Sequence, residues 1–143
     1  MGKLAGFGTE LQMSDMEVIP TFNIIAYVKS MGGPSLKVDT EDVTTLEQAT
    51  AWEEVVATII RSGEISLEIV YDPAEGTHDA TTGLLLNLAA KAVIDWKIVW
   101  PNHPTHTTWL VTALITGFEP GAPVEGGLTA TVTLKPTGAV TLP

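Results

Sequence analysis

Apolar and polar residues alternate at every second position in several short segments of this chain, and that period restricts what it can fold into. Residues 64–71 read E-I-S-L-E-I-V-Y, so that Ile65, Leu67 and Ile69 fall on one side. Residues 128–135 repeat the pattern as L-T-A-T-V-T-L-K. Successive side chains of a strand point to opposite faces, so each segment predicts a strand with one buried face.

Other segments favour strands because they are rich in β-branched and aromatic residues or continue the alternation. They are residues 22–29, 36–43, 93–100 and 107–118. A short strand is also expected around residues 10–13, within an N-terminal arm that covers residues 1–20. Pro and Gly residues predict a loop over residues 119–127, and residues 138–143 form a short C-terminal tail.

One helix is expected between about residues 78 and 90. Thr77 is placed to cap it, and Leu84, Leu85 and Leu88 lie on its apolar side. Gly83 lies near the middle, where it weakens the helix without excluding it. His78, at the start of this helix, is expected to be exposed.

Residues 44–62 are the least regular part and predict a long loop between two strands. The centre admits one or two helical turns, because Trp52, Val55, Val56 and Ile59 recur at helical spacing. An exposed patch of this kind is costly for a monomer. The segment therefore either folds onto the core or docks on another subunit, with Trp52 as an interface anchor.

These elements predict a single, mainly β domain over residues 1–143: a β-sandwich or half-barrel of antiparallel strands with one flanking α-helix. The chain has 143 residues, of which 45% are hydrophobic, which is enough for a packed core. Residues 1–7 are not followed by a long apolar stretch, so no secretory signal is expected there, and no run reaches about 18 apolar residues. Its net charge of −10, with only 7 Lys and Arg residues, argues against tight nucleic-acid binding.

The sequence predicts no catalytic site, no metal site and no cofactor. The absence of cysteine excludes disulfides and thiolate chemistry. His103 and His106 are spaced like metal ligands, but a zinc site needs a third ligand, so a solvent-exposed turn is the better interpretation. Asp39, Glu41 and Asp42 lack the central glycine of a calcium loop.

Glu64 and Glu68 form the best pair for acid–base chemistry, with Ser66 between them. Carboxylates at this spacing are more often the solvated face of a half-buried strand. Two alternatives to a structural protein therefore stay open. One is a small hydrolase that uses this pair, and the other is a monomeric β-sandwich binding module.

Four stretches, taken in order, resemble the tail tube (major tail) proteins of long, non-contractile-tailed bacteriophages, the lambda-like group. The first stretch, residues 22–36, reads F-N-I-I-A-Y-V-K-S-M-G-G-P-S-L, and residues 39–44 read D-T-E-D-V-T. Residues 52–73 follow with W-E-E-V-V-A-T-I-I-R-S-G-E-I-S-L-E-I-V-Y-D-P. The most specific stretch, residues 117–138, reads G-F-E-P-G-A-P-V-E-G-G-L-T-A-T-V-T-L-K-P-T-G.

The resemblance implies a structural subunit, and not an enzyme, that assembles into stacked hexameric rings and forms the conduit for DNA ejection. The implied partners are further copies of the chain, a tape measure protein, the tail terminator and tail-tip proteins. Double-stranded DNA would pass without specific binding, and no membrane binding is expected. The implied location is the virion tail, after synthesis in the host bacterial cytoplasm. Related tubes occur in gene transfer agents and injection particles, which remain an alternative.

The resemblance also implies roles for particular residues. The ring-stacking candidates lie in and beside the long loop: Asp39, Glu41, Asp42, Trp52, Val55, Val56 and Ile59. The acidic, polar lumen is expected to be lined by one of two strand faces: Glu64, Ser66 and Glu68, or Thr129, Thr131 and Thr133. The sequence does not decide between these faces. Both termini are expected to become ordered only on assembly.

Overall fold

The computed structural model describes residues 8–15, 19, 21–47, 52–101 and 108–142. These residues form nine strands and one helix: β1 (Glu10–Ser14), β2 (Phe22–Ile24), β3 (Val28–Gly32), β4 (Leu36–Asp42), β5 (Val55–Ser62), β6 (Ile65–Val70), α1 (Leu84–Ala90), β7 (Val93–Val99), β8 (Thr108–Gly121) and β9 (Thr129–Pro136). Seven strands form an antiparallel sheet in the order β2-β1-β7-β8-β9-β6-β3. The mainly β, antiparallel fold with one helix is as predicted.

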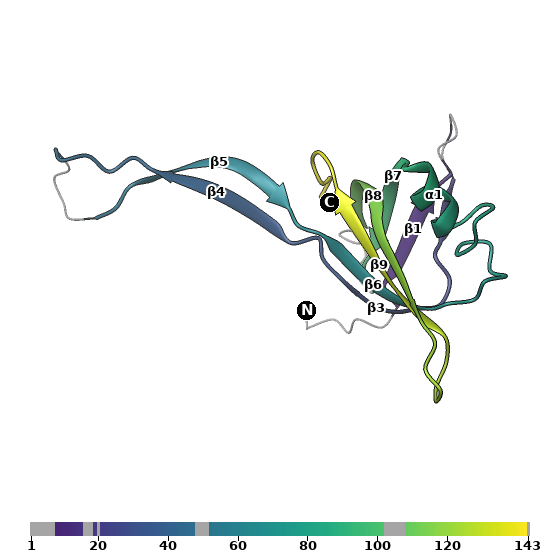
Figure 1. Ribbon diagram of the computed structural model, residues 1–143. Coiled ribbons are helices and arrows are strands. Elements are labelled where there is room, and N and C mark those ends of the chain that lie inside the picture. The colour runs from purple at the N-terminus through teal and green to yellow at the C-terminus, as the bar shows by residue number, and fades with distance from the viewer. Residues whose placement is uncertain (1–7, 16–18, 20, 48–51, 102–107, 143) are drawn as a thin grey trace.

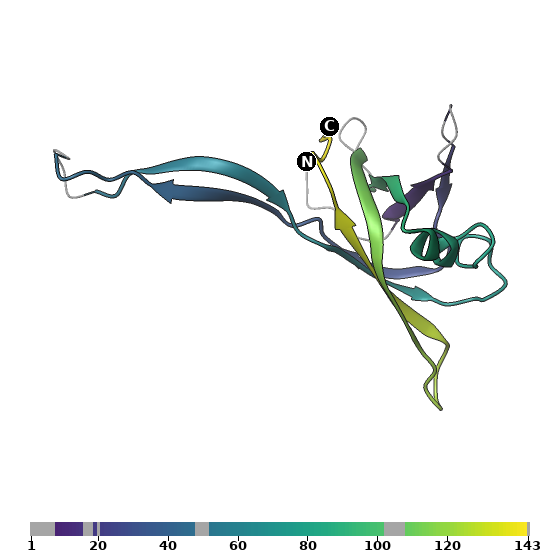
Figure 2. The ribbon, with the colours of Figure 1, turned by 45° about the horizontal axis from the view of Figure 1, so that its top comes forward.

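One face of the seven-stranded sheet forms the core, and the sheet curls around it with α1 alongside (Figure 2). The predicted alternation is confirmed in each long strand. The buried residues include Ile65, Leu67, Ile69, Ile94, Trp96, Ile98, Val111, Ala113, Ile115, Ala130, Val132 and Leu134. Trp96 is fully buried, and its Nε1 donates a hydrogen bond to the carbonyl of Ala113 at 3.1 Å. Its one polar atom is therefore satisfied inside the core.

The remaining two strands, β4 and β5, pair only with each other and project from the body as a long arm (Figure 1). The prediction of a loop over residues 44–62 is therefore wrong for its second half, which is β5. The proposed helical turns are also absent from the described part of this segment. Val55, Val56 and Ile59 are β-branched and favour extended backbone. Pairing with β4 also satisfies backbone groups that the ends of a short helix would leave unpaired.

The segment predicted as one strand over residues 22–29 is divided between opposite edges of the sheet. β2 pairs with β1 and β3 pairs with β6. Between them Tyr27 adopts a φ of 60°, in the left-handed region, and Ile25 is buried. The sequence cannot show that the chain crosses between two edges of the sheet here, because the residues of both strands have the same preference for extended backbone.

Both terminal segments pair with the seven-stranded sheet, which the sequence did not predict. The predicted short strand near residues 10–13 is confirmed as β1, but it lies inside the sheet between β2 and β7, and Leu11 and Met13 belong to the core. In the C-terminal tail, Thr141 exchanges two backbone hydrogen bonds with Leu110 of β8, at 2.8 and 3.0 Å. Parts of both terminal segments therefore pair with the seven-stranded sheet.

The helix begins at Leu84, later than predicted, because residues 72–83 form turns. His78, expected to be exposed, is fully buried. Its Nε2 donates to the carbonyl of Ala26 at 2.7 Å, and its Nδ1 accepts the backbone N–H of Asp72 at 3.3 Å. The imidazole thus links the turn before α1 to the crossover between β2 and β3.

Gly83 is required by close packing just before the helix. A Cβ there would lie 2.5 Å from the carbonyl carbon of Thr77 and 2.6 Å from the backbone nitrogen of His78. Both contacts are with backbone, which cannot move aside as a flexible side chain can. Gly83 therefore allows the turn to fold back on itself. The sequence indicated a different role, in which Gly83 lies inside the helix and weakens it.

Candidate functional site

A polar face covers the side of β3, β6, β9 and β8 that points away from the core. In the pairing of β6 with β9, Ser66 lies opposite Thr133 and Glu68 lies opposite Thr131. The two candidate lumen faces are therefore the same surface. Thr129 continues it opposite Val70, at the end of β6.

The polar face extends over two more strands. Ser30 of β3 lies opposite Glu68, and Glu119 of β8 lies opposite Thr131. One row of side chains thus crosses four strands: Ser30, Glu68, Thr131 and Glu119. A second row runs beside it and consists of Gly32, Ser66, Thr133 and Gly117. We call these two rows, together with Thr129, the polar face.

The sequence missed Glu119 because β8 contains an irregularity. The pairing register shifts between Ile115 and Gly117. Before this bulge the even-numbered residues of β8 face away from the core, and after it the odd-numbered residues do, because one extra residue reverses the alternation. β8 also continues to Gly121, into the segment that was predicted as a loop.

Hydroxyl groups dominate the polar face more than carboxylates do. Glu68 forms an ion pair with Lys29 at 3.7 Å, and the side chains are 45% and 51% exposed, so the pair is weak. Glu119 is exposed and is the second carboxylate. The face therefore combines hydroxyls with carboxylates, and the hydroxyls are the larger group.

Glu64 lies one residue before β6 and is exposed. On extended backbone, residues four apart are separated by about 13 Å. The carboxyl groups of glycoside hydrolases lie about 5–9.5 Å apart. The backbone positions of Glu64 and Glu68 are therefore farther apart than the carboxyl groups of such enzymes.

The arm holds all seven ring-stacking candidates. Asp39, Glu41 and Asp42 lie in β4, Val55, Val56 and Ile59 lie in β5, and Trp52 lies in the connection between them. The large apolar side chains of the arm are exposed, Trp52 by 78% and Ile60 by 73%. An isolated two-stranded hairpin is marginally stable in water, and exposed apolar side chains in such numbers mark an interaction surface.

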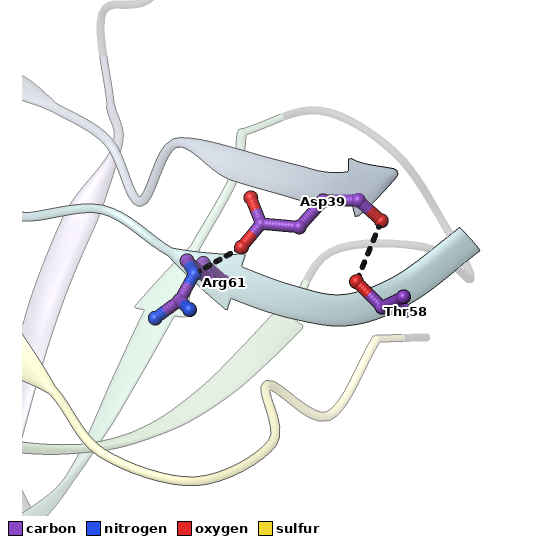
Figure 3. A network of polar contacts seen from close by, with 3 residues as sticks. All are labelled: Asp39, Thr58 and Arg61. Carbon is purple, nitrogen blue, oxygen red and sulfur yellow. Dashed lines mark hydrogen bonds and ion pairs between the residues drawn. The ribbon is translucent and has the colours of Figure 1, made fainter. Parts of the chain in front are cut away.

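A polar network holds a bulge in the arm (Figure 3). Asp39 accepts a hydrogen bond from Nε of Arg61 through its carboxylate and another from the Thr58 hydroxyl through its backbone carbonyl, the latter at 3.1 Å. The hydrogen bond and the charge of Asp39 raise the pKa of Arg61. Further out, Asp42 accepts the backbone N–H of Thr44 at 2.8 Å, and hydrogen bonding to Thr44 lowers the pKa of Asp42.

The described residues hold no cluster of three or more metal-binding side chains. His103 and His106 lie outside the described residues. No helix in the described part of the chain is long and apolar enough to span a membrane. The surfaces that distinguish this molecule are thus the polar face and the arm.

Solved structures with the same fold come from tubes of phage-like particles. A chain in the tail of an empty gene transfer agent particle, determined with C6 symmetry, is 17% identical, with a TM-score of 0.76 and 99% of both chains covered. A chain in the sheath/tube terminator of an extracellular contractile injection system is 15% identical, with a TM-score of 0.73 over 100% of this chain and 98% of that one. The SPP1 tail tube protein is 10% identical, with a TM-score of 0.64 over 91% and 73%.

The sequence gives the family directly. A comparison with curated protein sequences gave no match. The family described as lambda phage tail tube protein, in contrast, matches residues 8–143, which is nearly the whole chain and includes both the arm and the polar face. The resemblance noted in the sequence is thereby confirmed, and the chain belongs to the lambda phage tail tube protein family.

Proposed function

We propose that this tail tube subunit assembles into stacked hexameric rings whose lumen is lined by the polar face. The proposal rests on one observation: the two sets of lumen candidates lie on the same surface, on the side of the sheet away from the core. One set is Ser66 and Glu68 of β6, and the other is Thr129, Thr131 and Thr133 of β9. Four strands contribute to it, so a ring of copies would present a continuous polar wall. The role is structural, and no catalytic step is invoked.

The edges of the sheet suit ring closure. β2 and β3 are the outermost strands, and in the described part of the chain neither has a partner on its outer side. Open edges favour pairing with another chain, and a closed ring of strands removes them. Each copy would present one edge to the next, which is a head-to-tail contact of the kind that closes into rings.

A wall of this composition suits the passage of DNA. The hydroxyls of the polar face are neutral, and the carboxylate of Glu119 repels phosphate. Binding to the DNA backbone depends on cations that replace its counterions, and the charge of Lys29 beside the polar face is offset by Glu68. Double-stranded DNA would therefore move along the lumen without being held.

The arm is the proposed contact between rings. It projects beyond the body of the subunit (Figure 1), and its apolar side chains are exposed along both strands. The proposed partners beyond the tube itself are a tape measure protein, the tail terminator and the tail-tip proteins. The proposed site of synthesis is the host bacterial cytoplasm, followed by incorporation into the virion tail.

Electron microscopy of the purified protein tests ring formation, with six-fold rings or striated tubes as the expected result. A species that stays monomeric at high concentration would contradict the proposal. The lining is tested with Thr131→Cys, since the chain has no cysteine of its own. In assembled tubes a small maleimide should label this position and a large polymer-linked maleimide should not, whereas monomers should react with both. If the large reagent labels tubes as well as it labels monomers, Thr131 does not line the lumen.

A gene transfer particle is the second candidate setting. It is supported by the fold match to the tail of such a particle over 99% of both chains. The DNA packaged in particles that contain this protein distinguishes the two settings. A phage would carry its own genome, and a gene transfer agent would carry fragments of the host genome.

A further inference from the structure

A groove of about 590 Å³ lies where the arm joins the body, between β5 and the C-terminal tail. Its walls are largely apolar, with Leu36 and Ile60 on the arm side and Val140 and Leu142 on the tail side. Two cations also line it, Arg61 and Lys135. Arg61 is already ion-paired with Asp39, whereas Lys135 forms no ion pair among the described residues.

The far end of the arm has the opposite charge. Between Lys37 and Arg61 the chain contains no basic residue. The same stretch carries the acidic residue Asp39, which pairs with Arg61 near the base, and Glu41, Asp42, Glu47, Glu53 and Glu54 farther out. The arm is therefore acidic toward its tip, whereas Lys37 and Arg61 lie opposite each other across the two strands at its base.

The tip also has apolar side chains that suit the groove. Trp52 is 78% exposed and stands next to Glu53 and Glu54 in the sequence. Tryptophan is one of the residues enriched among the hot spots of protein interfaces. The tip cannot reach the groove of its own chain, because the seven residues of β4 alone hold the two ends about 20 Å apart.

We propose that the groove at the base of the arm receives the arm tip of a second copy of this chain. Trp52 enters the apolar part of the groove, and the carboxylates of Glu53 and Glu54 meet Lys135. The contact is head-to-tail, so every subunit both donates a tip and accepts one, and the contact repeats without closing on itself. The inference rests on the proposed role of the arm between rings and adds which surface of the neighbour receives it.

Cysteine cross-linking tests this contact, since the native chain has no cysteine. The test variant combines Glu53→Cys with Lys135→Cys, and the control combines Glu53→Cys with Lys91→Cys. Lys91 is exposed and follows α1, away from the groove. Under mild oxidation of assembled tubes, the test variant should form a ladder of covalent multimers on a denaturing gel, and the control should remain monomeric.

Charge reversal provides a second test that needs no bond at a defined distance. Lys135→Glu should reduce tube formation at least tenfold, Lys91→Glu should not, and adding Glu53→Lys to Lys135→Glu should restore it. The groove is not the docking site if the cysteine test variant forms tubes without cross-linking and Glu53→Lys does not restore tube formation to Lys135→Glu. The proposed function would stand in that case. If the unaltered chain forms no rings or tubes, the proposed function fails and this inference fails with it.

Discussion

Glu119 of β8 lies directly opposite Thr131 of β9, on the side of the sheet that points away from the core. Thr131 in turn lies opposite Glu68 of β6. The threonine is therefore flanked by a carboxylate on each side, one from the preceding strand β8 and one from β6, which is far away in the sequence. This row is the centre of the polar face, and it makes the proposed lumen open to direct tests.

Replacing Glu119 with lysine should convert a repelling wall into one that binds DNA. Each ammonium group exchanges for a counterion on the phosphate backbone, so binding should appear at low salt and weaken as salt is raised. Co-sedimentation of short duplex DNA with Glu119→Lys tubes, at low and high salt, measures it. The control is Glu125→Lys, which makes the same charge change in the exposed connection between β8 and β9. If the two variants retain the same amount of DNA, Glu119 does not line the lumen.

Replacing Trp52 with alanine should prevent tube formation without affecting the fold. The side chain is 78% exposed in the single chain, so little stability should be lost, within about 0.5 kcal/mol. An interface anchor, in contrast, loses about 2 kcal/mol or more per contact when it is truncated. Sedimentation measures assembly, and thermal unfolding of the unassembled chain measures stability. Val124→Ala, at another fully exposed apolar residue, is the matched control.

Replacing Gly83 with alanine should destabilise the subunit by about 1–3 kcal/mol, the usual cost of forcing an atom into a packed region. The added Cβ would approach the backbone of Thr77 and His78 to 2.5–2.6 Å. Gly127→Ala is the control, because nothing lies within 4 Å of its Cβ position. Chemical denaturation compares the two. An equal midpoint for both variants would show that the turn before α1 relaxes freely.

Asp79 should contribute to the stability of the turn before α1 in a pH-dependent way. Hydrogen bonding from the backbone of Thr82, with further bonds from Thr81 and from the Thr82 hydroxyl, lowers the pKa of Asp79 below the ordinary aspartate value. A lowered folded-state pKa means that the stabilisation is complete above the unfolded pKa, about 4. It is lost as the pH falls through the folded value.

The variant Asp79→Asn checks this expectation. Its unfolding midpoint should lie below that of the unaltered chain at neutral pH, and the difference should shrink as the pH falls toward 2. Glu125→Gln, at an exposed carboxylate, should shift the midpoint little at any pH. A difference between Asp79→Asn and the unaltered chain that does not change with pH would show that the ionised carboxylate is not the stabilising form.

The buried strands could be predicted because their signal is local. Ile65, Leu67 and Ile69 alternate with polar residues, and so do Ala130, Val132 and Leu134, and the structure buries all six. Each choice depends only on neighbours two positions away. The same local signal could not separate β2 from β3, nor distinguish a helical turn from β5, because short apolar runs fit either structure.

The candidate site could be predicted only in part. Five residues of the polar face, Ser66, Glu68, Thr129, Thr131 and Thr133, were identified from the sequence, as were the arm candidates between Asp39 and Ile59. The roles proposed for them await the tests above. Only the pairing register of β6 and β9 reveals that Glu68 and Thr131 lie on the same surface. Glu119 was missed because the bulge after Ile115 reverses which residues of β8 face outward.

The alternation of apolar and polar residues was enough to establish an antiparallel β protein with an apolar core, and the order of its motifs was enough to identify its family. The way the strands pair then produced the four-strand polar face, the free arm and the groove at its base. Pairing joins residues as distant as Ser30, Glu68, Thr131 and Glu119. A local period carries no information about such partners, because register is set by the packing of the whole sheet.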